Sequence, residues 1–285
     1  MNAPTSLGLR RAIDGPVVFL RQEARVLIGV SVALHLVAAL PGLLAVPWLD
    51  VNSLIDPVTG IDMQMLGLVA GATMAGALLG VPMAVAIFEA CRLRLDGEPI
   101  ETARLVHAAT RPRLLVAMFI QAMAVMLGVF MCVVPGAMAA VLFAMWLPVL
   151  LHEDVDVFTG ARRGIDVLKH RIGGTGVRAV WFVLVIFVVW LTWMLFVNTL
   201  GSVLSAAYST WMAIDSASRG ALSDPSALTA PWWLTTIVAV LTLLLRSVTD
   251  LFPTAAMLML YRSVREEQEG HALLEQLRQR AVEGA

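Results

Sequence analysis

Long apolar segments recur along the chain and constrain its fold more than any other feature. A helix of about 20 apolar residues crosses the hydrocarbon core of a bilayer, and lipid leaves no other partner for its backbone polar groups. Only 14% of the residues are charged, against roughly a quarter in a soluble domain. We therefore predict an all-α, polytopic membrane protein with six spans, at residues 26–48, 65–90, 114–134, 137–151, 177–200 and 232–260.

The distribution of arginine and lysine predicts the orientation of these spans. Basic residues gather before span 1, between spans 2 and 3, between spans 4 and 5, and after span 6. The segment 49–62 and the turn between spans 3 and 4 have none, and 201–231 has only Arg219. The positive-inside rule then places both termini in the cytoplasm. Residues 1–25 lack the short apolar core of a cleaved signal peptide, so we expect span 1 to act as an uncleaved insertion signal.

The basic segments before spans 1, 3 and 5 share one pattern, with apolar residues at helical spacing and charges elsewhere on the wheel. The predicted apolar faces are Leu9, Ile13, Val17 and Leu20; Ile100, Ala103, Val106 and Ala109; and Phe158, Ala161, Ile165 and Leu168. Such helices lie in the headgroup region with arginines toward anionic lipid. We predict three repeats of an interfacial elbow helix followed by a transmembrane hairpin. The alternative is that ordinary cytoplasmic loops carry basic amphipathic stretches.

The sequence Pro135-Gly136 predicts the turn between spans 3 and 4. Span 4 covers only about 22 Å as predicted, less than a bilayer core of about 30 Å. Either it begins before the turn, or the hairpin thins the membrane. A re-entrant hairpin also fits the uncharged turn, but span 3 is long enough to cross, so we favour two crossings.

Span 2 contains two pairs of glycines at GxxxG spacing, Gly67 with Gly71 and Gly76 with Gly80. Small residues let helices approach closely. We expect this face to pack within the chain, with a homo-oligomer contact as the alternative.

Span 6 is about 43 Å long as a helix. It must tilt, break at Pro253, or extend past the bilayer. Beyond the membrane domain at 1–262 we expect a charged cytoplasmic helix at 263–285. On the other side, Leu204, Tyr208 and Trp211 predict a short helix on the outer surface.

Polar residues inside spans are functional candidates because lipid makes them costly. Arg246 and Asp250 are four residues apart on one face of span 6 and can pair. His35 lies mid-span 1 and Gln121 mid-span 3. The functional interpretation is a site for a proton, an ion or a lipid headgroup. The structural alternative is that Arg246 and Asp250 form a neutral internal pair, or that Arg246 extends to the interface. His35 and Gln121 would then make interhelical hydrogen bonds.

An acidic cluster of Glu153, Asp154 and Asp156 follows His152 at the end of span 4. It lacks the HExxH spacing of a zinc site, and capping of the next helix explains it more simply. Nucleotide-binding, nucleophile-elbow and paired-cysteine patterns are not found in the sequence. We therefore expect no enzyme, no cofactor and no metal site, and no disulfide between Cys91 and Cys132.

Three stretches resemble the membrane domain of the glycerophosphoryl diester phosphodiesterase membrane-domain family and its uncharacterised six-span bacterial relatives. They are VVPGAMAAVLFAMWLPVLLHE at 133–153, GARRGIDVLKHRIGG at 160–174 and PTAAMLMLYRSVREEQEG at 253–270. The family often has an acidic residue two positions after the tyrosine of the last motif, where this chain has Ser263. The resemblance implies a bacterial inner membrane protein, and it supplies no catalytic residues.

These observations favour a non-enzymatic scaffold or accessory subunit of a membrane complex, in contact with lipids and a protein partner and not with nucleic acid. The alternative is a transporter or lipid-handling protein that uses Arg246 and Asp250. A third hypothesis is an intramembrane enzyme acting on lipid headgroups through His152, Glu153 and Asp154.

Overall fold

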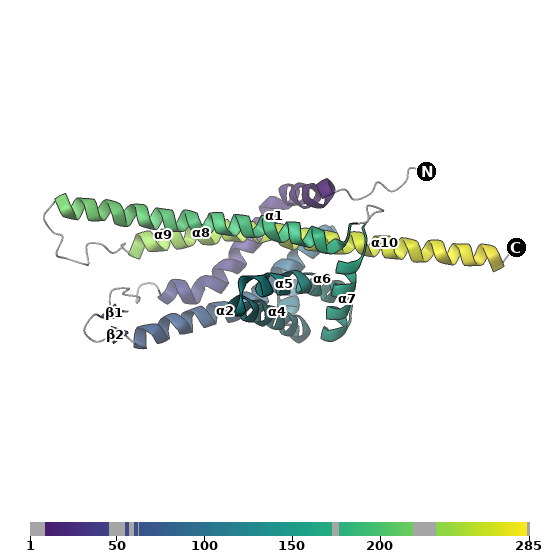
Figure 1. Cartoon of the computed structure of the whole chain (residues 1–285), viewed down its shortest axis with the longest axis horizontal. Coiled ribbons are helices and arrows are strands. Elements are labelled where there is room, and N and C mark those ends of the chain that lie inside the picture. The colour runs from purple at the N-terminus through teal and green to yellow at the C-terminus, as the bar shows by residue number, and fades with distance from the viewer. Residues whose placement is uncertain are drawn as a thin grey trace. The chain divides into compact units, whose positions relative to one another are not determined.

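The computed structural model describes residues 9–45, 55–56, 60–61, 63–172, 177–218 and 232–283. Within these ranges the chain is almost entirely helical (Figure 1). The helices are α1 (Leu9–Ala45), α2 (Met63–Leu95), α3 (Thr102–Thr110), α4 (Pro112–Met131), α5 (Val133–Phe143), α6 (Trp146–His152), α7 (Val157–Lys169), α8 (Ala179–Ser218), α9 (Trp232–Thr249) and α10 (Leu251–Glu283). A small antiparallel ladder pairs β1 (Ile55–Asp56) with β2 (Gly60–Ile61).

Six helical segments are long and apolar enough to cross a membrane, which confirms the predicted all-α class and the number of spans. They are Asp14–Ala45, Leu66–Leu95, Pro112–Met131, Val134–His152, Ala179–Tyr208 and Thr236–Gly270. The predicted outer-surface helix around Tyr208 is wrong, because α8 continues without a break through Ser218. The predicted tail at 263–285 is likewise a continuation of α10 as far as Glu283.

The chain divides into two compact units. Unit 1 comprises residues 1–27, 84–190 and 251–285, and unit 2 comprises residues 28–83 and 191–250. Each is described by itself below.

Prolines explain two helix interruptions. Helix α5 ends before Ala144, and α6 begins at Trp146. Pro148 has no N–H to donate to the carbonyl of Ala144, so the regular ladder fails one turn before the proline. The same argument applies to Pro253, whose missing donor would have bonded the carbonyl of Thr249, the last residue of α9. The predicted break of span 6 at Pro253 is therefore found at Asp250, one turn earlier.

The turn of the α4–α5 hairpin is at Cys132, and the predicted turn at Pro135-Gly136 is wrong. Cys132 is extended, with φ −176° and ψ 150°. Pro135 lies in the first turn of α5, where a missing N–H costs no helical hydrogen bond. Span 4 therefore begins at Val133, before the predicted start at Ala137, which resolves most of its apparent shortness.

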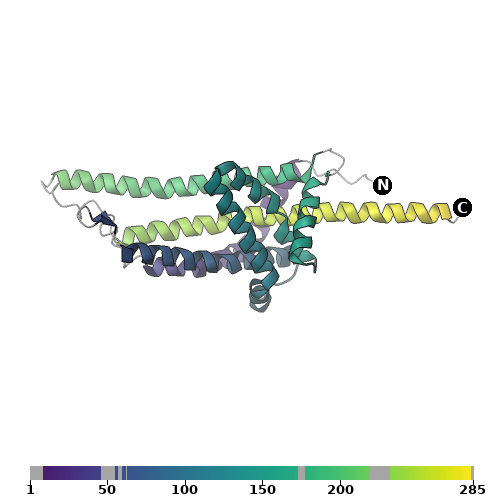
Figure 2. The same ribbon diagram turned by 60° about the horizontal axis from the view of Figure 1, so that its bottom comes forward.

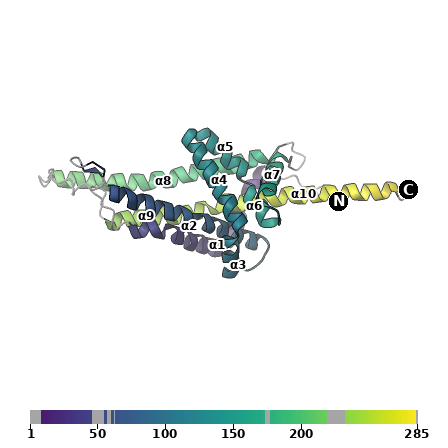
Figure 3. The same ribbon diagram turned by 90° about the horizontal axis from the view of Figure 1, so that it is seen from below.

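Gly136 has a packing role in this hairpin. A Cβ at Gly128 would lie 2.6 Å from the Gly136 Cα, and a Cβ at Gly136 would lie 2.8 Å from the Val129 backbone nitrogen. The two backbones therefore touch where only glycine fits. Figures 2 and 3 show α4 running steeply across α10, both in unit 1. A membrane normal parallel to α10 is thus oblique to α4, and the two crossings of this hairpin stay a prediction.

Helix α6 is the centre of packing in unit 1. Its first five residues, Trp146 to Leu150, are all buried. Trp146, Leu147 and Leu150 belong to a cluster with residues of α2, α3 and α4. Met145 and Val149 belong to a second cluster with residues of α5, α7, α8 and α10. The short helix therefore joins two apolar cores.

In the short helices α3 and α7, one residue of each predicted apolar face, Ala109 and Leu168, is buried against the protein, and Val106 and Phe158 are exposed. In α7 the buried residues are Gly160, Gly164, Val167 and Leu168, whereas Phe158 is 75% exposed. A Cβ at Gly160 would lie 2.5 Å from Leu150 Cδ2, so these glycines let α7 dock on α6. In α3 the buried residues are Leu105, Ala108 and Ala109, and Val106 is exposed.

The proposed threefold repeat is not shown by the structure. Helices α3 and α7 are separate short helices before spans 3 and 5. Before span 1 the chain is one continuous helix, α1, from Leu9. The repeat therefore stays a prediction.

The glycine face of α2 packs tightly within unit 2 at one position. A Cβ at Gly76 would lie 3.3 Å from the carbonyl oxygen of Ala38 in α1. A Cβ at Gly67, Gly71 or Gly80 would meet no atom of the described chain within 4 Å. The expected internal packing is thus limited to Gly76.

Replacing Gly128 with alanine should open the α4–α5 hairpin, because its methyl group would meet backbone that cannot move aside as a side chain can. We expect a lower melting temperature of the detergent-solubilised protein, measured by intrinsic fluorescence. Gly71→Ala is the matched control, a helical glycine in open space. Equal melting temperatures for the two variants would contradict the close approach at Gly128.

Candidate functional site

Three of the predicted polar residues meet in unit 2. His35 Nε2 lies 3.2 Å from Asp250 Oδ2, and Arg246 Nε lies 3.7 Å from the same oxygen. His35 comes from α1, Arg246 from α9, and Asp250 is the residue between α9 and α10. The interruption before Pro253 therefore places the carboxylate of Asp250 between His35, from another span, and Arg246, from the helix that Asp250 follows.

His35 contacts polar atoms on both sides of its ring. Its Nδ1 lies 2.8 Å from the carbonyl oxygen of Ser31. Its Nε2 lies 3.2 Å from Asp250 Oδ2. Which ring nitrogen donates depends on the tautomer of the imidazole. The ring therefore links the backbone of its own helix to the carboxylate of Asp250.

Ser31 is fully buried and joins α1 to α9. Its hydroxyl donates to the carbonyl oxygen of Ser247 at 2.7 Å. Ser247 lies in the last turn of α9, where carbonyls lose their helical partners. A donor from the neighbouring span satisfies one of them, as the apolar surroundings require. No sequence pattern singles out Ser31, because its partner is on another helix.

Gln121 is not part of this cluster. It lies on α4 in unit 1 and is partly exposed. The prediction that it shares an interior with His35 therefore has no support from the cluster described here.

The acidic cluster fastens α6 and α7 to their neighbours in unit 1. The hydroxyl of Tyr261 in α10 donates to Glu153 Oε1 at 2.8 Å. Arg163 of α7 donates to the other oxygen of Glu153, and Arg113 of α4 donates to Asp154. The contacts with Tyr261 and Arg113 join elements that are distant in sequence, and the contact with Arg163 joins α7 to the end of the preceding helix.

Asp156 is the N-cap of α7, as the sequence predicted for this cluster. Its carboxylate accepts from the backbone N–H of Thr159 at 3.0 Å. Hydrogen bonds from Thr159 hold the pKa of Asp156 below its ordinary value. The contribution of this cap to stability is therefore fully present above the unfolded pKa of Asp156. It is lost as pH falls through the lower pKa that Asp156 has in the folded protein. Each of the three carboxylates thus has a structural role.

Sequence reasoning missed the contacts of α10 in unit 1. Arg262 donates to the backbone oxygen of Leu95 at 2.9 Å and pairs with Asp96. Asp96 in turn lies 3.2 Å from Arg92, which donates twice to the buried Glu89. These residues lie near span ends, where charges are ordinary, so their position in the sequence gave no signal.

Metal sites and disulfides are not found among the residues that the structure describes. No group of three His, Cys, Asp or Glu side chains in those ranges could hold a metal ion. Cys91 is a buried free thiol, and Cys132 is an exposed one.

Comparisons of the chain with protein-family models, with curated proteins and with solved structures find no match. The residues, their geometry and the resemblance described in the sequence therefore carry the functional arguments that follow.

Replacing Glu153 with alanine should destabilise unit 1, because Tyr261 loses its acceptor and Arg163 its partner. We expect the free energy of unfolding to fall by about 2 kcal/mol, as for a charged hydrogen bond in a partly buried setting. Asp154→Ala is the control, since its side chain is 92% exposed and such pairs contribute about 0–1 kcal/mol. Chemical denaturation in detergent measures both. A larger loss for Asp154→Ala would contradict the assignment.

Proposed function

We propose that the protein is a non-enzymatic scaffold or accessory subunit of a membrane complex. The observation that carries this proposal is the use of the acidic cluster. Glu153, Asp154 and Asp156 each bond another element or cap a helix. Glu153 and Asp154 thus bond other elements and Asp156 begins α7, which is the use of carboxylates expected in a framework. The third hypothesis, an enzyme working through His152, Glu153 and Asp154, requires a carboxylate free for substrate and is weakened by these contacts.

The location that we propose is a bacterial cytoplasmic membrane with both termini in the cytoplasm. The arginine-rich ends of the spans support the orientation. The resemblance to the glycerophosphoryl diester phosphodiesterase membrane-domain family supports the bacterial source and remains part of the proposal. A protein partner and membrane lipids are the contacts expected of such a subunit.

Native mass spectrometry of the gently extracted protein from its own host tests the scaffold proposal. We expect a second protein in stoichiometric amount. A preparation that contains this chain alone, at every detergent concentration down to the lowest that extracts it, would contradict the proposal.

The alternative function is transport of a proton or another cation. The specific observation in its favour is the contact of His35 with Asp250 inside the spans, with Arg246 beside the same carboxylate. Ionisable residues that pair inside spans commonly mark proton pathways. Proteoliposomes with an internal pH dye and an imposed potential separate the two functions. Proton flux that Asp250→Asn abolishes and the exposed control Asp166→Asn preserves would replace the scaffold proposal with transport.

A further inference from the structure

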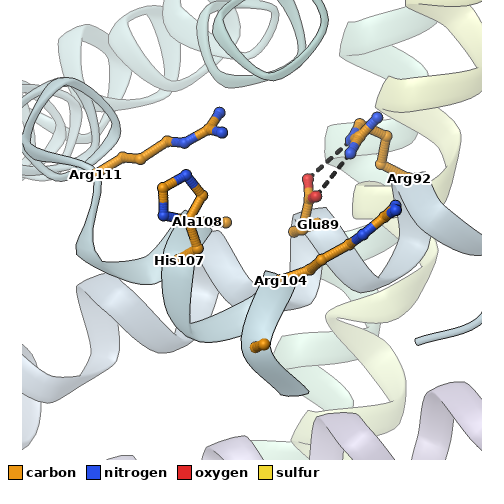
Figure 4. A pocket seen from close by; sticks show the side chains of 7 residues that line it. Glu89, Arg92, Arg104, His107, Ala108 and Arg111 are labelled. Atoms are coloured by element: carbon orange, nitrogen blue, oxygen red, sulfur yellow. Dashed lines mark hydrogen bonds and ion pairs between the residues drawn. The ribbon is translucent and has the colours of Figure 1, made fainter. Parts of the chain in front are cut away.

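A cavity of about 390 Å³ lies in unit 1 between the end of α2 and helix α3. Four of its lining residues are basic: Arg92, Arg104, His107 and Arg111. Figure 4 shows Arg111 and His107 on one side of the open space and the Glu89–Arg92 pair on the other. Its volume is in the range of sites that hold small polar ligands.

The arginines around this cavity differ in how far neighbouring carboxylates neutralise them. Glu89 accepts two hydrogen bonds from Arg92, at 2.8 and 2.7 Å, and so neutralises it. Arg104 pairs with Glu98 and lies 3.6 Å from Glu101. Among the residues that the structure describes, the guanidinium of Arg111 has no carboxylate or carbonyl partner. The cavity therefore has an excess of positive charge, and Arg111 carries it.

The polypeptide positions Arg111 through its backbone alone. Arg111 is at once the C-cap of α3 and the N-cap of α4, and its side chain makes no cap hydrogen bond. Pro112 occupies the first position of α4 and fixes the direction of the chain there. The backbone thus places Arg111 in the wall of the cavity. A guanidinium presents these donors in a planar fork that matches phosphate.

A neighbouring cavity provides a useful contrast. It also has Arg111 in its wall, but its lining includes the carboxylates Glu153 and Asp154. Anions are not favoured there. The cavity beside α3 has a single carboxylate, Glu89, which Arg92 already satisfies.

We propose that the cavity beside α3 binds a phosphate group and that Arg111 is its principal ligand. The surroundings favour the phosphate of a membrane lipid. Val106 of α3 directly precedes His107 of the cavity lining and is 56% exposed, so an apolar side chain lies open next to the basic cavity. The orientation predicted from the arginines puts this end of α2 and α4 at the inner headgroup layer. The proposal is independent of whether the protein is a scaffold or a transporter.

Lipid titration of the full-length protein in a neutral detergent tests this site. Native mass spectrometry measures binding of dioleoyl phosphatidylglycerol, with dioleoylglycerol as the ligand that lacks phosphate. We expect phosphatidylglycerol to bind the wild type and Arg111→Gln to weaken it about tenfold, as for loss of a charge-assisted pair. Arg111→Lys should be intermediate, because it keeps the charge and loses the fork.

Arg162→Gln is the matched control, an exposed arginine on α7 away from the cavity. It should bind phosphatidylglycerol as the wild type does. Because the Arg111 side chain makes no cap bond, the melting temperature of Arg111→Gln should equal that of the wild type, which separates lost binding from lost folding.

Competition by inorganic phosphate distinguishes the two sources of the ligand. Displacement of the lipid at millimolar phosphate supports a site for the phosphate group itself, and no displacement supports a lipid site in which the acyl chains contribute. Equal binding of dioleoylglycerol would overturn the proposal. An equal loss in Arg111→Gln and Arg162→Gln would also overturn it, because the attraction would then be a general property of the basic surface.

Discussion

The burial of α6 is the interaction on which unit 1 depends. In lipid, helices associate through close packing and not through removal of apolar surface from water, so a short helix must fit its neighbours closely. Trp146 and Leu150 fill one cluster and Val149 fills the other. The indole N–H of Trp146 donates to the carbonyl oxygen of Val157 at 2.8 Å, which holds the start of α7. Gly160 then lets α7 lie directly on α6.

The polar contacts of unit 1 extend from this packing. Glu153 comes directly after α6, so the burial of α6 sets its position beside Tyr261 and Arg163. On the other side of the same core, Ala108 of α3 is buried, and this orients α3 with His107 and Arg111 toward the basic cavity. The packing of α6 thus sets the positions of both the acidic cluster and Arg111.

The spans were predictable because lipid forces any long apolar run to be helical, whatever its neighbours are. The interruptions were misplaced because a proline disturbs the carbonyl four residues before it and is tolerated in a first turn. Pro148 and Pro253 act in the first way and Pro135 in the second. The pairing of Arg246 with Asp250 follows from helical spacing. The contact of Asp250 with His35, 215 residues away, and that of Glu153 with Tyr261 depend on tertiary packing, which no local pattern encodes.

The distribution of arginines predicts that the basic ends of the spans share one side of the membrane and that the tip of the α4–α5 hairpin reaches the other. The native thiol of Cys132, exposed at the tip, reports one side, and Asp154→Cys reports the other; Cys91 is buried. The direct measurement is labelling with a membrane-impermeant maleimide in spheroplasts and in inverted vesicles. We expect Cys132 to react in spheroplasts only and the new thiol in inverted vesicles only. Reaction of both from the same side would contradict this expectation and make the hairpin re-entrant.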